Sequence, residues 1–222
     1  MPAMRAVAVV PGQHGSAHLR DDAPDPTPAE GDAVVRVLEA GVCGTDVEIH
    51  DGEYGEAPAG SPFLILGHEN LGIVESSPAG AHVQPGDLVV ATVRRPCPQA
   101  CVPCASGQND MCVTGNFKER GIRGLHGFMS ERWRIEPEYA MKVDSSLGIL
   151  GVLLEPTTVV AKAWEQVSLV GQRAFWEPQH VLVTGAGPIG LLAALLGRQR
   201  GLDVHVLDRM TSGPKPELVR AV

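Results

Sequence analysis

The chain has 222 residues, 44% of them hydrophobic and 20% charged, which is enough for one large or two small globular domains. Its 18 basic and 26 acidic residues give a net charge of −8, so we expect a small-molecule ligand and no nucleic-acid partner. No uninterrupted apolar run approaches the ~20 residues of a membrane span, and the N-terminus lacks the features of a signal peptide. We therefore expect a cytoplasmic protein without a membrane partner.

The first part of the chain predicts short strands. The apolar segments RAVAVV, DAVVRVLEAGVCG, LGIVE and DLVVATV are separated by turn-forming sequences such as Pro11-Gly12 and Pro85-Gly86-Asp87. No helix is expected before about residue 147. The stretch GILGVLLEPTTVVAKAWEQV then has apolar residues at helical spacings, with Pro156 expected to break or kink the helix.

The last part of the chain predicts alternating strands and helices. The strand HVLVT (His180–Thr184) is nearly all apolar, as in the centre of a parallel sheet. The helical segment LLAALLGRQR should stop at Gly201, DVHVLD should form the next strand, and a further helix should begin near Lys215. We place two domains at residues 1–160 and 161–222.

The segment GAGPIG lies between the first strand and the first helix of this part, and it fits the pattern G-x-G-x-x-G. In that context it predicts a dinucleotide-binding turn, although a plain strand–turn–helix fits the same letters. Gly185 would permit the tight turn, Gly187 the approach of the pyrophosphate, and Gly190 the packing of helix on strand. Unpaired amides at the helix start would face the phosphate. The predicted cofactor-binding residues of this turn are Gly185, Gly187, Pro188, Ile189 and Gly190.

Two further residues bear on the choice of cofactor. Asp208 ends the next strand, eighteen positions beyond Gly190, and there it would accept hydrogen bonds from the adenosine ribose and favour NAD. Arg209 follows it and could instead bind the 2′-phosphate of NADP. The sequence leaves both cofactors open.

Four of the five cysteines fall within sixteen residues, in the segment CPQACVPCASGQNDMC. Four thiolates in a loop rich in proline, glycine and alanine match a tetrahedral structural zinc site, which leaves no position for a substrate. An iron–sulfur cluster or two disulfides are the alternatives. The predicted ligands are Cys97, Cys101, Cys104 and Cys112.

A second set of metal ligands is scattered along the chain. His68 and Glu69 interrupt the apolar segment FLILGHENLGIV, where an ionised carboxylate needs a cation. Cys43 lies between glycines in GVCGTD, and Glu155 lies in the apolar segment LLEPTT. Zinc binds such sulfur, nitrogen and oxygen donors, and catalytic zinc sites keep a position open. Taken singly, the cysteine could be inert packing and the histidine a hydrogen-bonded core residue.

These pieces carry a family resemblance over essentially the whole chain. GVCGTD, GHENLG, VQPGD, the four-cysteine segment and GAGPIG occur in the order typical of zinc-dependent medium-chain dehydrogenases. Within that family, RRPCPQACVPC, KERGIRGLHGFMSE and LLEPTTVVAKA are most similar to the glucose 1-dehydrogenase branch. The first gap in the cysteine segment is one residue longer than is usual in the family, which a flexible loop can absorb.

The resemblance implies a mainly-β GroES-like catalytic domain followed by an α/β Rossmann cofactor domain. It implies that Cys43, His68, Glu69 and Glu155 surround a catalytic zinc. Thr45 would then serve in the proton relay and in substrate binding, and Asp46 would orient His68. The substrate-binding residues implied are Thr45, Glu119 and Glu155. A solvated loop charge is the alternative for Glu119 and for Asp46.

The implied reaction is oxidation of the anomeric hydroxyl of an aldose by NAD or NADP, with an aldonolactone as product. An alcohol or polyol dehydrogenase of the same family is the alternative. A Rossmann domain needs more strands than the two visible here, so we expect a truncated cofactor domain. The chain could then be a zinc-binding fragment without activity. A full-length form would be a homodimer or homotetramer.

Overall fold

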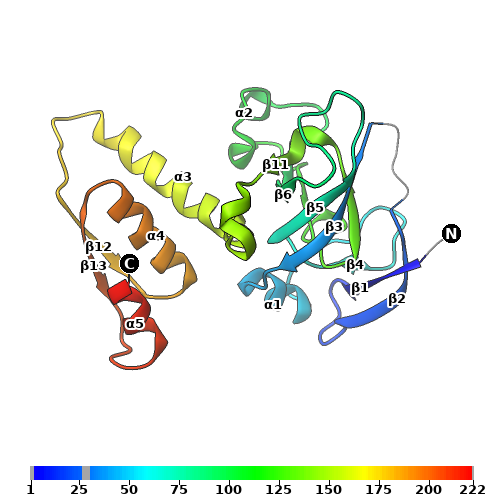
Figure 1. The fold of residues 1–222 in the computed structure, drawn as a ribbon, viewed down its shortest axis with the longest axis horizontal. Helices are drawn as coiled ribbons and strands as arrows, with labels where there is room; N and C mark the ends of the chain where they lie inside the picture. Colours follow the sequence, from blue (N-terminus) through cyan, green and yellow to red (C-terminus); the bar gives the residue numbers. More distant parts are fainter. Residues whose placement is uncertain (1–2, 27–30, 222) are drawn as a thin grey trace. The chain divides into compact units, whose positions relative to one another are not determined.

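A computed structural model describes residues 3–26 and 31–221. The chain divides into two compact units, and the division falls between Leu153 and Leu154 (Figure 1). We call them the N-terminal unit and the C-terminal unit and describe each by itself. The domain limits of 1–160 and 161–222 stay predictions.

The N-terminal unit is built from short, mostly antiparallel strands in three sheets (Figure 1). The largest sheet has the order β10-β3-β5-β6-β11, and its strands are β3 (Ala33–Ala40), β5 (Asn70–Ser76), β6 (Leu88–Ala91), β10 (Arg132–Ile135) and β11 (Ala140–Lys142). The other two sheets have the orders β2-β1-β4 and β7-β8-β9, with strands β1 (Ala3–Val9), β2 (His18–Pro24), β4 (Leu64–Ile65), β7 (Arg94–Arg95), β8 (Lys118–Arg120) and β9 (Gly124–Leu125). The strands expected from RAVAVV, LGIVE and DLVVATV are confirmed as β1, β5 and β6.

Alternation along the strands builds the main core. On β10, Trp133 and Ile135 are buried. The side chains of Arg132, before this pair, and Arg134, within it, reach the surface. Trp133 meets the ring of Phe128 edge-on at 4.9 Å between centroids, an arrangement that aromatic pairs prefer. Phe128 is fully buried, so this pair fills the centre of the unit beneath the largest sheet.

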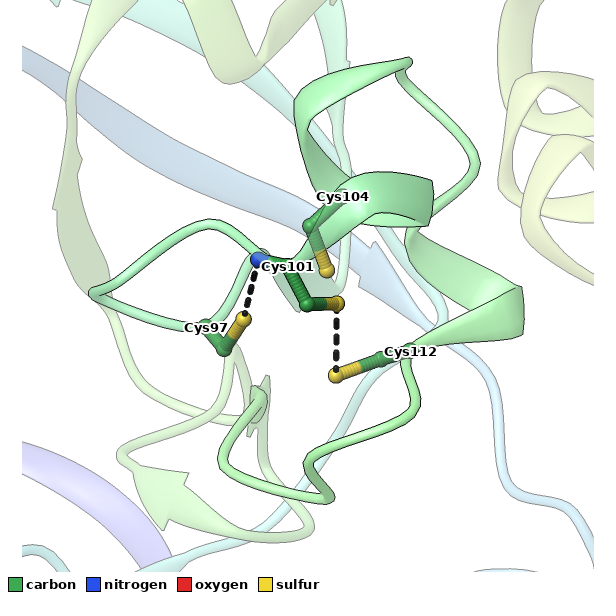
Figure 2. A group of neighbouring side chains, drawn as sticks. All are labelled: Cys97, Cys101, Cys104 and Cys112. Atoms are coloured by element: carbon green, nitrogen blue, oxygen red, sulfur yellow. Dashed lines mark hydrogen bonds between the residues drawn. The ribbon is translucent and has the colours of Figure 1, made fainter.

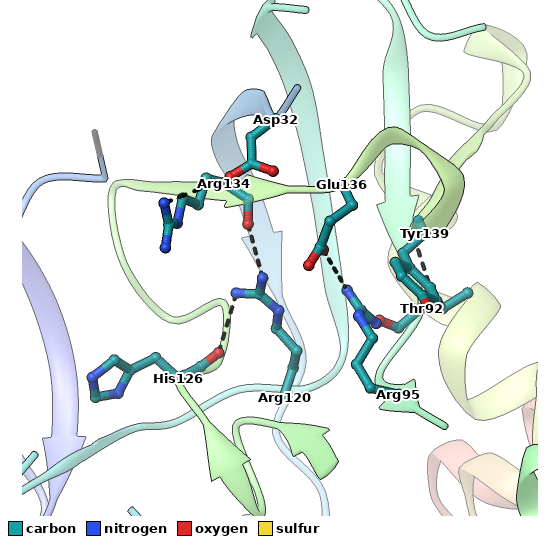
Figure 3. Close-up of polar contacts among 8 residues, drawn as sticks. All are labelled: Asp32, Thr92, Arg95, Arg120, His126, Arg134, Glu136 and Tyr139. Carbon is teal, nitrogen blue, oxygen red and sulfur yellow. Dashed lines mark hydrogen bonds and ion pairs between the residues drawn. The ribbon is translucent and has the colours of Figure 1, made fainter. Parts of the chain in front are cut away.

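Two arginines connect the small sheet β7-β8-β9 to this core (Figure 3). Arg120 on β8 donates to the backbone carbonyl of Arg134 on β10 at 3.0 Å, and burial lowers its pKa to about 10. Arg95 on β7 donates to the carbonyl of Thr92 at 2.9 Å and pairs with Glu136 at 3.4 Å. Charged donors form stronger hydrogen bonds than neutral ones, so these contacts fix how the small sheet sits on the large one.

His126 supplies a neutral acceptor in the same unit. Its Nδ1 atom accepts a hydrogen bond from the backbone N–H of Ile65 at 3.1 Å, and its ring stacks on Phe63. Burial lowers the pKa of His126, and the positive charge of Arg120 lowers it further. Protonation would remove the acceptor, so the neutral ring belongs to the folded state.

We expect His126→Asn to flatten the dependence of stability on pH. The lowered pKa means that the stabilising contribution of His126 is complete above the unfolded-state pKa of ~6.5 and is lost as pH falls through the folded-state value. Asparagine keeps an acceptor near Nδ1 and does not titrate. Urea unfolding at a series of pH values should show the wild type losing stability relative to the variant below pH ~6.5. His18→Asn is the control, and parallel profiles for wild type and His126→Asn would contradict the prediction.

The prediction of no helix before residue 147 is wrong. Helices α1 (Gly44–His50) and α2 (Val102–Ala105) lie earlier, with the short 3₁₀ helices η1 (Asn109–Met111) and η2 (Pro137–Tyr139). The strand expected to run through GVCG ends at Ala40, because Cys43 becomes the N-cap of α1. The backbone N–H of Cys43 donates to Asp46 Oδ2 at 3.0 Å, which closes a capping box and starts the helix.

Pro156 does not break a helix. The 3₁₀ segment η3 (Ser145–Leu153) precedes α3 (Leu154–Gly171), and Pro156 lies in the first turn of α3, where its missing N–H costs no hydrogen bond. By length and mean hydropathy alone, Ser145–Gly171 could cross a membrane, although no uninterrupted apolar run does so. That is weak support for a membrane span, since core helices of soluble proteins share these properties.

The C-terminal unit contains two parallel strands and three helices. After α3 come β12 (His180–Thr184), α4 (Pro188–Gln199), β13 (Asp203–Leu207) and α5 (Pro214–Ala221), which confirms the predicted strand–helix–strand. Gly201 ends the α4 region with a φ of 78°, which favours glycine. Among the described residues β12 pairs with β13 alone, and alternate side chains of both strands are exposed on one face.

Candidate metal centres and glycine-rich turn

Three of the scattered ligand candidates converge in the N-terminal unit. Cys43, His68 and Glu69 each offer one ligand atom, and these three atoms lie within 4.8 Å of one another. Cys43 precedes α1, whereas His68 and Glu69 lie between β4 and β5. Gly67 makes the turn before them with a φ of 91°. We call this group the Cys-His-Glu centre.

Asp46 links two members of the centre. Cys43 Sγ lies 3.0 Å from His68 Nε2, and on the other side of the ring Asp46 Oδ1 lies 3.6 Å from His68 Nδ1. Both His68 and Asp46 are about 95% buried. The same carboxylate caps α1 through the Cys43 amide, whereas its other oxygen and His68 Nδ1 are buried and make no hydrogen bond among the described residues. This is the usual arrangement of a metal-bound histidine with a carboxylate behind it.

Glu69 is a half-buried carboxylate in surroundings that favour a nearby cation. Burial raises the pKa of Glu69, His68 opposes this rise, and the charge of Asp46 adds to it. A Cβ atom on Gly41 would overlap the Glu69 carboxylate, so only glycine leaves room for it. The donor set of thiol, imidazole and carboxylate therefore fits a zinc ion on grounds of chemistry as well as spacing.

The remaining candidates for this centre are placed as follows. Thr45 lies half-buried in the first turn of α1, next to Asp46. Glu155 lies in the first turn of α3, and therefore in the C-terminal unit, whereas the Cys-His-Glu centre belongs to the N-terminal unit. The roles of Thr45 as proton relay and of Glu155 as a further ligand stay predictions.

The second centre is the loop that holds the other four cysteines, residues 97–112, which we call the cysteine lobe. Figure 2 shows their sulfur atoms turned toward a common point around α2. Cys101 Sγ lies 3.9 Å from Cys112 Sγ, and the Cys101 amide donates to Cys97 Sγ at 3.3 Å. All five cysteines of the chain are described and all are free thiols, which gives no support to the alternative of two disulfides.

The thiols of the cysteine lobe are not equivalent. Hydrogen bonding to Thr114 lowers the pKa of Cys112 to about 6, and the amides of Cys104 and Val113 lower that of Cys101. The amide of Cys97 acts to lower the pKa of Cys104, but burial and the neighbouring thiols outweigh it and raise the value to about 12. Four adjacent sulfurs cannot all ionise without a cation among them, and a zinc ion meets that need.

Glu119 lies neither in a solvated loop nor alone. It is buried on β8, where the strand register places it opposite Arg94 on β7. The guanidinium of Arg94 donates to Glu119 Oε1 from Nε at 3.0 Å and from Nη2 at 2.7 Å. Sequence reasoning missed this partner because Arg94 and Glu119 are distant in the chain and only the strand pairing joins them. A role of Glu119 toward sugar hydroxyls stays a prediction.

The glycine-rich turn has the predicted form. Gly185 adopts a φ of 97°, Gly187 is the N-cap of α4, and Pro188 and Ile189 begin the helix. A Cβ atom on Gly190 would overlap the carbonyl oxygen of Gly185, so the third glycine is needed for close packing. The turn therefore leaves the N-terminus of α4 open toward an anion.

The end of β13 is tied to this turn. The backbone N–H of Ala186 donates to Asp208 Oδ2 at 2.7 Å, and that of Met210 donates to Oδ1 at 2.8 Å. These amides, with Lys215 nearby at 3.6 Å, lower the pKa of Asp208. A cavity of about 760 Å³ at this point is lined by Asp208, the exposed Arg209 and Lys215, among others. Lys215 is a further charged residue here that the sequence analysis did not single out.

Comparisons with known proteins agree with both units. Residues 29–145 match the family described as alcohol dehydrogenase GroES-like domain, and residues 148–222 match the family described as glucose dehydrogenase C-terminus. A glucose 1-dehydrogenase from Methanocella arvoryzae is 52% identical over 204 residues, which cover 90% of this chain and 56% of that protein. One from Thermoproteus tenax is 44% identical, with 90% of this chain and 56% of that protein covered.

A solved structure gives the same result. The structure described as Haloferax mediterranei glucose dehydrogenase in complex with NADP, Zn and gluconolactone is similar with a TM-score of 0.86 and 34% identity. The match covers 98% of this chain and 62% of that one. The chain thus spans between 56% and 62% of the length of these three proteins.

The chain belongs to the zinc-dependent medium-chain dehydrogenases, the alcohol dehydrogenase family with a GroES-like domain. Within that family it lies in the glucose dehydrogenase-like branch, to which both its C-terminal match and its named relatives point. The resemblance and the fold class inferred from the sequence are confirmed.

Proposed function

We propose that this chain acts in the zinc-dependent oxidation of an aldose, glucose first, at its anomeric hydroxyl. NAD or NADP would accept the hydride, and an aldonolactone would be released. The observation that carries the proposal is the convergence of Cys43, His68 and Glu69 within 4.8 Å in a chain of the glucose dehydrogenase-like branch. The Haloferax mediterranei glucose dehydrogenase, whose structure is a complex with NADP, zinc and gluconolactone, supports the same chemistry.

The residues that would hold the catalytic metal are Cys43, His68 and Glu69, with Glu155 as a further carboxylate. Zinc bound there would supply a Lewis acid that lowers the pKa of the substrate alcohol. Asp46 would orient the imidazole of His68 from behind, where its Oδ1 lies 3.6 Å from Nδ1, and it accepts a hydrogen bond from the Cys43 backbone amide. Thr45, one residue before Asp46, would carry the substrate proton outward.

Other residues would position the reactants. Arg94 holds the carboxylate of Glu119 in one place, so that Glu119 can accept hydrogen bonds from sugar hydroxyls without losing its position. The glycine-rich turn, Gly185–Gly190, and the end of β13 would bind the cofactor. The four cysteines of the cysteine lobe would hold a structural zinc with no open position.

A substrate panel tests this proposal. Zinc-loaded protein with NAD or NADP should reduce the cofactor when glucose or another aldose is added. The competing function is that of an alcohol or polyol dehydrogenase, which has the same zinc and the same cofactor. Turnover with ethanol, threonine or sorbitol but not with aldoses would contradict the sugar assignment. Full zinc loading without turnover on any substrate would instead favour a zinc-binding chain without activity.

The cofactor preference can be tested with half-cofactors. We expect Arg209→Ala to weaken binding of 2′-phospho-ADP-ribose at least tenfold, or about 1.4 kcal/mol, because the variant loses a cation next to the 2′ position. Binding of ADP-ribose, which lacks that phosphate, should change little. Calorimetric titration of both ligands measures the difference, and Arg200→Ala in the same unit is the control. An equal loss of affinity for both ligands would show that Arg209 does not bind the 2′-phosphate.

The assembly and location are also proposals. Relatives named as glucose dehydrogenases support a soluble, cytoplasmic enzyme without nucleic-acid or membrane partners, and we propose a homodimer or homotetramer for a form of full length. Light scattering on the purified enzyme measures its oligomeric state directly, and a monomer would contradict the proposal.

A further inference from the structure

A third group of metal-ligating side chains lies in the C-terminal unit, outside everything described above. The parallel register pairs His180, the first residue of β12, with Asp203, the first residue of β13. His205 lies two residues along β13 from Asp203, and therefore on the same face of the pair. All three side chains are more than half exposed, so solvent reaches them from this face.

The three side chains already point toward one another. His180 Nδ1 lies 2.9 Å from Asp203 Oδ2, and His205 Nε2 lies 3.1 Å from the same oxygen. The three ligand atoms lie within 4.8 Å of one another. A tetrahedral zinc ion with bonds of about 2.0–2.1 Å holds neighbouring ligand atoms about 3.3 Å apart. Both nitrogen–oxygen distances lie within about 0.5 Å of that spacing.

We propose that His180, Asp203 and His205 form an exchangeable site for a divalent transition-metal ion, zinc first. Two imidazoles and one carboxylate suit zinc, copper, nickel and iron(II), and poorly suit magnesium or calcium, which prefer oxygen ligands. Three protein ligands leave at least one position for water, and no thiolate takes part. The site therefore binds more weakly than the cysteine lobe and exchanges its ion with solvent. A bound ion joins β12 to β13 at the start of both strands.

Zinc titration by calorimetry, with metal analysis after dialysis, tests the site. We expect the wild type to bind one weak zinc beyond those held by thiolate-containing sites, and His205→Gln to weaken that step at least tenfold. His180→Gln, on the other strand, should do the same. His14→Gln is the matched control, because His14 is also an exposed histidine beside a carboxylate, with Nδ1 3.5 Å from Asp51, and should leave the titration unchanged.

Two further measurements separate this site from the other centres. Cobalt bound at this weak site should give no thiolate charge-transfer band, whereas cobalt bound in either cysteine-containing centre should give one. Zinc at this site should also slow amide exchange in β12 and β13 of the wild type and not of His205→Gln. Circular dichroism checks that each variant stays folded. If a histidine variant does not fold, Asp203→Asn is tested in its place.

Two results would overturn the proposal. One is a wild type whose titration shows no zinc binding beyond the thiolate-containing sites. The other is a weak zinc-binding step whose affinity is unchanged in both histidine variants. Neither result depends on dehydrogenase activity, so the proposed function and this site can fail separately.

Discussion

Cys104→Ser is expected to remove one zinc per chain and to unfold the cysteine lobe. Cys104 is buried at the end of α2, and its thiol is one of four that converge on a common point. Structural zinc in small peptides contributes about 10–16 kcal/mol of apparent binding free energy, which here is folding free energy of the lobe. Metal analysis should show one zinc fewer per chain, and the backbone amides of residues 97–112 should lose their protection against exchange.

The matched control is Ser106→Ala, in the same turn. Its hydroxyl donates to the carbonyl of Val102 and touches no thiol, so this variant should keep its zinc and lose at most a modest fraction of stability. If Cys104→Ser keeps its full zinc content and an ordered lobe, the four cysteines do not form a structural metal site.

Cys43→Ala is expected to show the opposite pattern. It removes the sulfur of the Cys-His-Glu centre, so one zinc should be lost while the cysteine lobe stays protected. The Lewis acidity of a metal is worth several kcal/mol to a reaction, and about 4 kcal/mol corresponds to about a 10³-fold loss of rate. Single-turnover reduction of the nicotinamide cofactor with an aldose measures that loss. Thermal stability should fall little, because α1 is capped through the backbone of residue 43.

Val42→Ala is the control for this position, since Val42 is exposed and immediately precedes the thiol. This variant should keep its zinc content and its rate of cofactor reduction. A Cys43→Ala protein that unfolds, beside an active Cys104→Ser protein, would mean that the structural and catalytic assignments are reversed.

From β12 onward, the elements of the C-terminal unit could be predicted closely. The apolar pattern and the glycines that mark turns correctly predicted three elements: the strands in HVLVT and DVHVLD and the helix after GAGPIG. These signals are local, since each depends on neighbours within a few positions. The exposed faces of β12 and β13 were not predicted, because an apolar sequence indicates a buried strand but not whether another layer covers each of its faces.

The N-terminal unit was less predictable. Helices α1 and α2 have only seven and four residues, too short for a periodic pattern, and α1 depends on a cap made by Cys43 and Asp46. The pairing of Arg94 with Glu119 depends on strand register across 25 positions. The ligand residues themselves were recognisable, because a charged or thiol side chain in apolar sequence signals a site wherever the fold later brings its partners.

The hydrogen bond from Ala186 to Asp208 would constrain any redesign of the proposed cofactor site. Asp208 is the residue expected to bind the adenosine ribose, but its carboxylate also joins the glycine-rich turn to the end of β13. An exchange at position 208 would release the turn together with the charge, so binding of the pyrophosphate would suffer along with selectivity. Redesign has a freer choice at Arg209, which lines the same cavity, than at Lys215, which lies 3.6 Å from the Asp208 carboxylate.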